Sequence, residues 1–238
     1  MDPRRALSFG AVAATYDRSR PGYPAEAVRW VVGTDRPLRV LDVGAGTGKL
    51  TAALLGLGHE VVAVEPDDAM RALVPPAAEV LAGTAEQLPL PVGCVDAVVA
   101  GQAFHWFDVD RALPEMVRVL RPGGSVGLLW NVLDDDVPWV SDLCDLSGPA
   151  DRASYLRMAE EPPFDGPAVG LTVPERLLVE HAQDVDADLL VDNLRSRSQI
   201  IVQGEAERED LLRQARALAP AGRFPLPYVC GAWRSVRA

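Results

Sequence analysis

The fold is decided by the stretch Arg39-Val-Leu-Asp-Val-Gly-Ala-Gly-Thr-Gly-Lys-Leu50, in which a short apolar run breaks into three alternating glycines and continues as an Ala/Leu-rich segment. This pattern predicts a strand, a tight turn and a helix. Val40, Leu41 and Val43 are typical of a strand buried on both faces, and glycines at the turn leave room for a ligand against the backbone. Taken alone, the glycines fit equally well a turn that only joins the strand to the helix.

The segment after the glycines favours a ligand. A helix is expected over Leu50–Leu57, and the apolar run Glu60-Val-Val-Ala-Val-Glu-Pro66 then ends in a carboxylate about 17 residues after the last glycine. In a strand-helix-strand unit of this size, an acidic residue at the tip of the second strand meets the hydroxyls of a ribose lying across the first turn. The sequence therefore predicts a site for an adenosine-containing molecule, with Glu65 on the ribose.

The glycine spacing narrows the choice of ligand. A dinucleotide turn needs G-x-G-x-x-G, whereas this chain has G-x-G-x-G with Lys49 where the third glycine belongs. A Walker loop is also missing, because the four-residue gap is absent and Leu50 follows in place of Ser or Thr. Asp42 would repel a pyrophosphate but suits a ligand that carries an ammonium and a sulfonium. S-adenosylmethionine carries both.

Further motifs follow in a fixed order along the chain. The ordered set is Val40-Leu-Asp-Val-Gly-Ala-Gly-Thr-Gly48, Val64-Glu-Pro66, Gly83-Thr-Ala-Glu-Gln-Leu-Pro89, Val95-Asp-Ala-Val-Val99, Gln102-Ala-Phe-His-Trp-Phe-Asp108, Arg118-Val-Leu-Arg-Pro-Gly-Gly124 and Trp130-Asn131. It resembles the motifs of class I S-adenosylmethionine-dependent methyltransferases of the small-molecule branch. The resemblance implies an α/β, Rossmann-like, doubly wound fold: a mostly parallel seven-stranded sheet with helices on both faces and an antiparallel last strand.

The resemblance also implies a set of cofactor-binding residues. They are Tyr16, Arg20, Asp42, Gly44, Ala45, Gly46, Gly48, Glu65, Pro66, Thr84, Ala85, Glu86 and Gln102. Arg20 is expected to pair with the cofactor carboxylate, and the loop 83–89 to hold the adenine edge, with Thr84 where the family often has Asp. The alternatives are that Tyr16 and Tyr23 only pack the first helix onto the domain, and that Glu86 is a solvated helix-start residue.

Candidate substrate residues follow the expected fourth strand, Cys94–Gly101. Open α/β sheets bind ligands outside the carboxyl ends of their strands, so the segment that begins at Gln102 stands where chemistry is expected. The expected substrate contacts are Tyr23, His105, Trp106, Trp130 and Asn131. His105 is the candidate base or positioning residue, and a packed core histidine is the equal alternative. His59 and His181 are expected to be structural.

Length favours one domain over residues 1–238. We expect a helical lid in 1–30, a cofactor-binding core in 38–131 and substrate-specific walls in 134–222. In the latter part, helices are predicted near Trp139–Leu146, over 186–195 and over 205–218, and a strand over 176–183. Phe224-Pro-Leu-Pro-Tyr-Val-Cys-Gly-Ala-Trp233 is predicted to be an edge strand, because prolines cannot donate to a central ladder.

Composition excludes several classes of protein. The net charge of −11 argues against nucleic acid as a partner, since such binding rests on neutralised phosphates. No apolar run is long enough to span a membrane, and the N-terminus lacks a secretory pattern, so a cytoplasmic location is expected. Three widely spaced cysteines suggest neither disulfides nor zinc, and Asp134-Asp-Asp136 is expected to be a solvated turn, so no metal is assigned. A homodimer is among the assemblies that the sequence allows.

The leading hypothesis is methyl transfer from S-adenosylmethionine to an O, N or C atom of a small-molecule acceptor by in-line displacement. The chief alternative is a non-catalytic S-adenosylmethionine-binding or interaction protein with the same fold. A nucleic-acid methyltransferase is disfavoured by the charge and by the lack of an Asn-Pro-Pro-Tyr-type pocket after the fourth strand. A nicotinamide oxidoreductase is disfavoured by Lys49.

Overall fold

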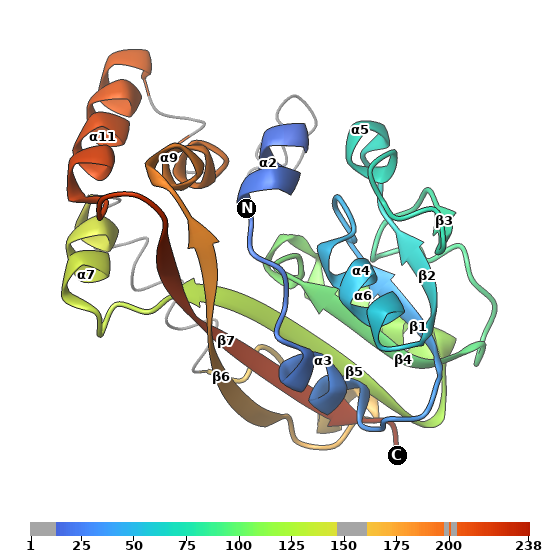
Figure 1. The fold of residues 1–238 in the computed structure, drawn as a ribbon. Coiled ribbons are helices and arrows are strands. Elements are labelled where there is room, and N and C mark those ends of the chain that lie inside the picture. Colours follow the sequence, from blue (N-terminus) through green and yellow to red (C-terminus); the bar gives the residue numbers. More distant parts are fainter. Residues whose placement is uncertain (1–12, 147–160, 198–199, 201–203) are drawn as a thin grey trace.

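A computed structural model describes residues 13–146, 161–197, 200 and 204–238, and its centre is a seven-stranded sheet of order β3-β2-β1-β4-β5-β7-β6 (Figure 1). The strands are β1 (Arg39–Val43), β2 (Glu60–Val64), β3 (Glu79–Leu81), β4 (Val95–Gly101), β5 (Leu120–Leu133), β6 (Glu175–Val185) and β7 (Phe224–Val236). The Rossmann-like class expected from the sequence is confirmed by this order and by the helices around the sheet.

The five strands β1 to β5 are parallel. β1 lies between β2 and β4, with Val40 opposite Val61 on one side and Ala97 on the other. Four of its five residues are buried, as the apolar run predicted for a strand covered on both faces. Consequently the glycine turn, the tip of β2 and the tip of β4 open at the same edge of the sheet.

β5 includes residues on both sides of the Pro-Gly-Gly sequence. It begins at Leu120, directly after the preceding helix. The Pro-Gly-Gly sequence lies where the pairing of β5 with β4 shifts its register, between the pairs Val95–Leu120 and Ala97–Ser125. Gly124 fits this bulge because an added Cβ would lie 2.7 Å from the Asp96 carbonyl oxygen.

β7 is antiparallel, but the expectation that it forms the edge of the sheet is wrong. It pairs with β5 on one side and with β6 on the other, so β6 is the edge strand. The prolines are tolerated because β5 ends at Leu133, opposite Tyr228. Pro225 and Pro227 therefore lie in the part of β7 that has only β6 beside it, where a missing N–H costs no ladder bond on the open side.

Helices cover both faces of the sheet (Figure 1). One face packs on α3 (Ala25–Val32) and α4 (Lys49–Gly56), and the other packs on α6 (Val109–Val119). The short elements are α5 (Asp68–Arg71) and the single-turn helices η2 (Phe104–Trp106) and η3 (Pro167–Val169). These two apolar layers bury both faces of the sheet.

A third apolar cluster lies beyond the carboxyl end of β5. It joins α7 (Pro138–Asp145), α9 (Ala187–Arg195) and α11 (Glu205–Leu218) to the ends of β5, β6 and β7. We call these three helices the cap. The first described helix, α2 (Ala13–Ser19), lies beside α9, and Arg18 forms an ion pair with Asp192 at 2.6 Å (Figure 1). Residues 1–12, which are part of the helical lid expected in 1–30, lie outside the described residues.

Candidate cofactor and acceptor site

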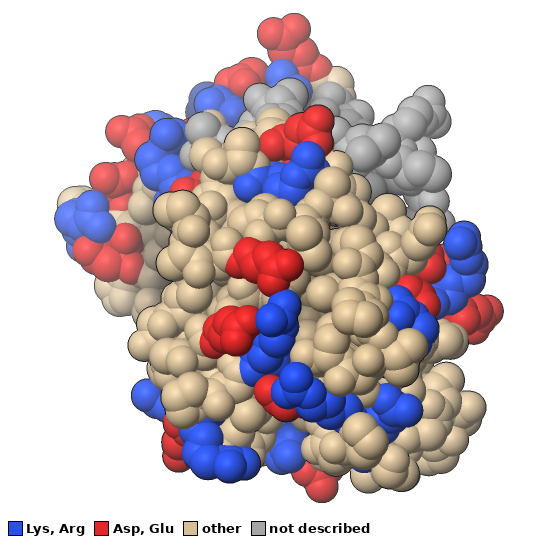
Figure 2. Space-filling view, turned by 90° about the vertical axis from the view of Figure 1, so that its right-hand side faces the viewer, with Lys and Arg blue, Asp and Glu red and all other residues tan. Residues whose placement is uncertain are grey.

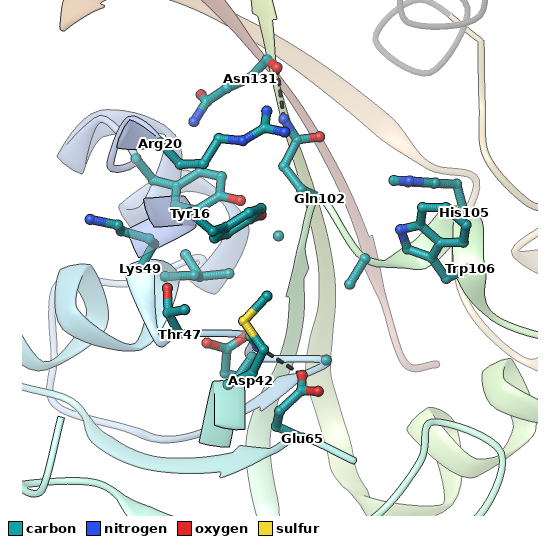
Figure 3. A pocket seen from close by; sticks show the side chains of 18 of the residues that line it. Tyr16, Arg20, Asp42, Thr47, Lys49, Glu65, Gln102, His105, Trp106 and Asn131 are labelled. Atoms are coloured by element: carbon teal, nitrogen blue, oxygen red, sulfur yellow. Dashed lines mark hydrogen bonds between the residues drawn. The ribbon is translucent and has the colours of Figure 1, made fainter. Parts of the chain in front are cut away.

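A cavity of about 300 Å³ lies at the carboxyl ends of β1, β2 and β4 and extends to the cap. Figure 3 shows that its side chains come from α2 and the residue after it, the glycine turn, the strand tips and η2. The structure brings together most of the residues expected at the site. They are Tyr16, Arg20, Tyr23, Asp42, Gly44, Ala45, Gly46, Glu65, Pro66, Thr84, Ala85, Glu86, Gln102, His105, Trp106 and Asn131. Gly48 and Trp130 do not line the cavity.

The three glycines of the turn have different roles. All three have positive φ, which glycine adopts without strain. A Cβ on Gly44 would lie 2.8 Å from the Ala103 Cβ, and one on Gly48 would lie 2.5 Å from Pro75 Cδ. A Cβ on Gly46 would meet nothing within 4 Å, although Gly46 lines the cavity. Gly44 and Gly48 are therefore required for packing, and Gly46 keeps ligand space open.

Glu65 at the tip of β2 is fixed by the backbone around it. One carboxylate oxygen accepts from Gly46 N at 2.8 Å and the other from Asp67 N at 2.9 Å. The side chain is 7% exposed, and burial raises its pKa, while these two hydrogen bonds oppose that shift. Each oxygen keeps a second lone pair, so the carboxylate can accept further hydroxyl donors.

Asp42 at the end of β1 is the most deeply buried carboxylate of the cavity wall. Its Oδ2 accepts from the Thr51 hydroxyl at 2.6 Å, whereas Oδ1 is buried with no partner among the described residues. Burial raises the Asp42 pKa to about 7, and nearby Glu65 adds to this effect. A buried acceptor without a donor is costly, so this oxygen fits a cationic ligand group.

The loop expected to hold the adenine edge is tied to the next helix. Glu86 Oε1 accepts from Asp108 N at 3.0 Å, where α6 begins. Burial acts to raise the Glu86 pKa, but hydrogen bonds from Asp108 and Thr84 and the charge of Arg111 lower it overall. Thr84, Ala85 and Glu86 thus form a fixed wall of the cavity.

The tip of β4 carries a strained residue. Gln102 has φ +54°, and it is the single non-glycine residue with positive φ in the described part of the chain. Its Nε2 donates to the Asn131 carbonyl at 2.7 Å, while Asn131 Nδ2 donates to the Gly22 carbonyl at 3.0 Å. Such strain persists where surrounding contacts determine it and is frequent at functional sites.

His181, which the sequence suggested was structural, reaches this network. Its Nε2 lies 2.9 Å from Asn131 Oδ1, and its ring stacks on Tyr228 with centroids 5.5 Å apart. His59 is structural as expected, since it is 5% exposed and its Nδ1 accepts from Leu38 N at 3.2 Å.

His105 stands in η2 at the opposite side of the cavity from Tyr16 and Lys49 (Figure 3). Burial lowers its pKa to about 4, so the ring is neutral at physiological pH. Trp130 Nε1 donates to its Nδ1 at 3.4 Å. A neutral ring that accepts at Nδ1 carries its proton on Nε2 and is a donor there. Trp130, 2% exposed, thus lies behind His105 rather than at the substrate surface.

Helix α2 and the residues that follow it contact both the end of α9 and the glycine turn. Arg20 donates to Ser196 Oγ at 3.0 Å and to the Ser196 carbonyl at 3.2 Å, with its guanidinium 5.1 Å from the Tyr16 ring centre. Lys49, the residue that breaks the dinucleotide spacing, forms an ion pair with Asp17 of α2 at 3.3 Å. Tyr23 packs on the end of β4, because a Cβ on Gly101 would lie 2.4 Å from its hydroxyl.

Sequence reasoning missed the cap side of the cavity. Leu133, Asp135, Cys144, Arg197 and Tyr228 line it, and they come from three cap-side segments and β7. None of them belongs to a motif, because this part of the chain is irregular. The only signal was the general expectation that 134–222 holds substrate walls.

Several features bear on the expected partners. Among the described residues, no three His, Cys, Asp or Glu side chains are grouped to hold a metal ion. Asp134 Oδ1 accepts from Asp136 N at 3.2 Å, which closes a turn before α7. On the face in Figure 2, basic and acidic side chains lie beside one another without a broad basic stripe in the residues shown. Within the described part of the chain, no helix combines the length and apolarity needed to cross a membrane.

Comparison with known proteins supports one family. Residues 41–128 match the model of a methyltransferase domain. An uncharacterized methyltransferase of Mycobacterium tuberculosis is 40% identical over 235 residues, covering 94% of this chain and 93% of that protein. An uncharacterized methyltransferase of Schizosaccharomyces pombe is 32% identical over 200 residues, covering 81% and 79% of the two chains.

Solved structures share the fold. A proposed type II methyltransferase from Anaeromyxobacter dehalogenans superimposes with a TM-score of 0.65 at 24% identity, covering 92% of this chain and 97% of that one. The cyclase SpnF superimposes with a TM-score of 0.50 at 18% identity, covering 90% and 80%. Likeness at this identity concerns the fold, and the relatives of higher identity decide the family. The chain belongs to the class I S-adenosylmethionine-dependent methyltransferases.

Proposed function

We propose that this enzyme transfers a methyl group from S-adenosylmethionine to an O, N or C atom of a small molecule, by in-line displacement within the described cavity. The observation that carries the proposal is Asp42 Oδ1, a buried acceptor without a donor at the wall of a cavity that Gly46 keeps open. A ligand with an ammonium group would satisfy this oxygen, and a backbone without a side chain lets such a ligand approach.

The residues around these two positions fit the rest of the cofactor. Glu65 would accept the ribose hydroxyls with its remaining lone pairs, and the loop at Thr84 and Ala85 would contact the adenine. Gln102 would contact the methionine part at the strand tip. When bound, S-adenosylmethionine supplies an electrophilic methyl group: an electron pair of the acceptor, a lone pair on O or N or a π pair at C, bonds to the methyl carbon as the C–S bond breaks, leaving S-adenosylhomocysteine and, from an O–H, N–H or C–H acceptor, one proton.

The chain's contribution would be positioning and exclusion of water. Alignment of two reactants in one cavity can supply on the order of 7 to 11 kcal/mol of barrier reduction. Gln102 donates to the Asn131 carbonyl at the wall of the cavity, and the aromatic side chains of His105, Trp106 and Phe107 also line it. His105 would orient the acceptor as a donor at Nε2.

A small acceptor agrees with the size and cover of the cavity. Its volume of about 300 Å³ is at the lower end for ligand pockets, and the cap and lid both contribute to its walls. The net charge of −11 adds an argument against a polyanionic acceptor.

The test is binding followed by transfer. Calorimetry should show that S-adenosylhomocysteine binds, and a panel of small acceptors with radiolabelled S-adenosylmethionine should then give labelled product. Binding without transfer to any acceptor would favour the non-catalytic alternative, whereas no binding would refute the cofactor assignment.

A further inference from the structure

The cavity has a cationic end that the cofactor proposal does not use. Arg197 lies just beyond α9 and lines the cavity on the cap side, where it is 9% exposed. Its Nη2 donates to Asn193 Oδ1 at 3.4 Å, and its Nε is buried with no partner in the described residues. No ion pair to Arg197 occurs within this part of the chain. A buried guanidinium without an anion is costly, since desolvation of a charge is repaid only by pairing.

Other donors surround the same end of the cavity. Tyr228, 3% exposed, accepts a hydrogen bond from Asn193 Nδ2 at 3.1 Å, and its own O–H donates to no described residue. Arg20 is the second guanidinium on the wall, held through Ser196. Burial raises the Tyr228 pKa, while the charges of Arg197 and Arg20 act to lower it, which places both cations near its hydroxyl. Asp135 also lines this end of the cavity, and its negative charge would repel an anionic ligand.

We infer that the cap end of the cavity binds an anionic group of the methyl acceptor, a carboxylate, through Arg197 with help from Tyr228, while Arg20 remains the expected partner of the cofactor carboxylate. The acceptor is then a small organic acid. A guanidinium presents paired N–H donors that match the two oxygens of a carboxylate, which explains an arginine at a buried position with an unused N–H. This inference rests on the proposed function, because it assigns the substrate class of the same site.

Because the methionine part of the cofactor also carries a carboxylate, the experiment must show whether Arg197 binds the acceptor or the cofactor. The experiment uses the full chain and Arg197→Met, which keeps length and apolar surface but removes the charge. Arg197→Lys keeps the charge and loses the paired geometry. Arg195→Met is the matched control two residues earlier, at the end of α9: Arg195 is exposed and pairs with Glu209 at 3.6 Å outside the cavity. Melting temperatures verify that each variant is folded.

The first measurement is binding to protein saturated with S-adenosylhomocysteine at constant ionic strength. The probes are succinate and benzoate, the neutral succinamide and benzamide, and inorganic phosphate. At least one acid should bind about 10-fold more tightly than its amide. Arg197→Met should weaken that acid about 10- to 100-fold, Arg197→Lys should restore part of the loss, and Arg195→Met should match the parent protein. Phosphate that binds as tightly as either acid would overturn the assignment to a carboxylate.

The second measurement is the affinity for S-adenosylhomocysteine without acid. It should change less than about twofold in Arg197→Met. A loss as large as that for the acid would assign Arg197 to the cofactor carboxylate and overturn the acceptor subsite. Equal binding of acids and amides by the parent protein would overturn it as well. Failure of the cofactor proposal looks different, because S-adenosylhomocysteine itself would not bind.

Discussion

The Glu65 carboxylate accepts a hydrogen bond from the Gly46 backbone N–H at 2.8 Å, so this side chain joins the tip of β2 to the glycine turn after β1. This bond places the candidate ribose acceptor directly against the residue whose missing side chain opens the cavity. A substitution of either residue should therefore reduce cofactor affinity more than it reduces the stability of the fold.

Glu65→Gln should weaken S-adenosylhomocysteine binding by roughly 1 to 3 kcal/mol, because a charge-assisted acceptor for the ribose hydroxyls becomes a neutral amide. Calorimetry measures the change. Glu60→Gln is the matched control, since Glu60 is exposed at the other end of β2 and pairs with Arg39. Equal affinity of Glu65→Gln and the control would remove Glu65 from the site.

Gly46→Val and Gly48→Val should distinguish a glycine that leaves room for the ligand from a glycine that is required for packing. In Gly46→Val the side chain enters the cavity, so S-adenosylhomocysteine affinity should fall more than about 100-fold. Strain at positive φ, about 1 to 2 kcal/mol, should lower Tm by roughly 2 to 8 °C. Gly48→Val should lower Tm further, because its side chain meets Pro75 and Val74. Full ligand affinity of folded Gly46→Val would refute the assignment of the turn.

Much of this site could be predicted because its signals are local. Glycines that alternate after a buried strand require positive φ, and an acid at the next strand tip is brought to them by parallel pairing. The distinction between Gly46 and Gly48 could not be predicted, since it depends on Val74 and Pro75, which come from another segment of the chain. Arg197 and Tyr228 reach the cavity only through the packing of the cap, for which the sequence has no periodic motif.

The error about β7 has a similar cause. The two prolines correctly indicate a segment with one open side, but only the length of β5 decides which segment that is. The short η2 helix likewise decides which nitrogen of His105 contacts Trp130, and no spacing rule predicts that contact.

Asp42 should make cofactor affinity depend on pH. Its pKa is raised to about 7, so affinity for S-adenosylhomocysteine should rise between pH 5.5 and 7.5 as the carboxylate forms and pairs with the ligand ammonium. Asp42→Asn should bind more weakly and lose this rise. Because burial also raises the Glu65 pKa, Glu65→Gln is measured in parallel, and a rise that persists in Asp42→Asn but vanishes in Glu65→Gln would contradict the assignment.

The ligand-free protein should show the opposite dependence. The pKa of Asp42 in the folded state is above its unfolded value of 3.8, so its contribution to stability is present below pH 3.8 and is lost as pH rises through 7. Asp42→Asn should therefore raise Tm relative to the parent protein at pH 8, and the gain should shrink toward pH 4. Thermal unfolding across this range measures it, and a constant difference in Tm would show that Asp42 does not titrate near 7.

His105 should act as a donor that orients the acceptor, since Trp130 donates to its Nδ1 and leaves the proton of the neutral ring on Nε2. His105→Gln, which keeps a side-chain donor, should retain turnover within about 10-fold. His105→Phe, which keeps a ring without a donor, should lower turnover about 10- to 100-fold, while the affinity for S-adenosylhomocysteine stays within twofold.

The pH dependence of turnover separates orientation from base catalysis. If protonation of His105 lowers turnover, the fall should occur near its pKa of about 4 and not near pH 6.5. Turnover of the parent protein that falls through pH 6.5, together with a loss of more than 10²-fold in both variants, would instead identify His105 as a general base. Full turnover of His105→Phe would reduce its role to packing.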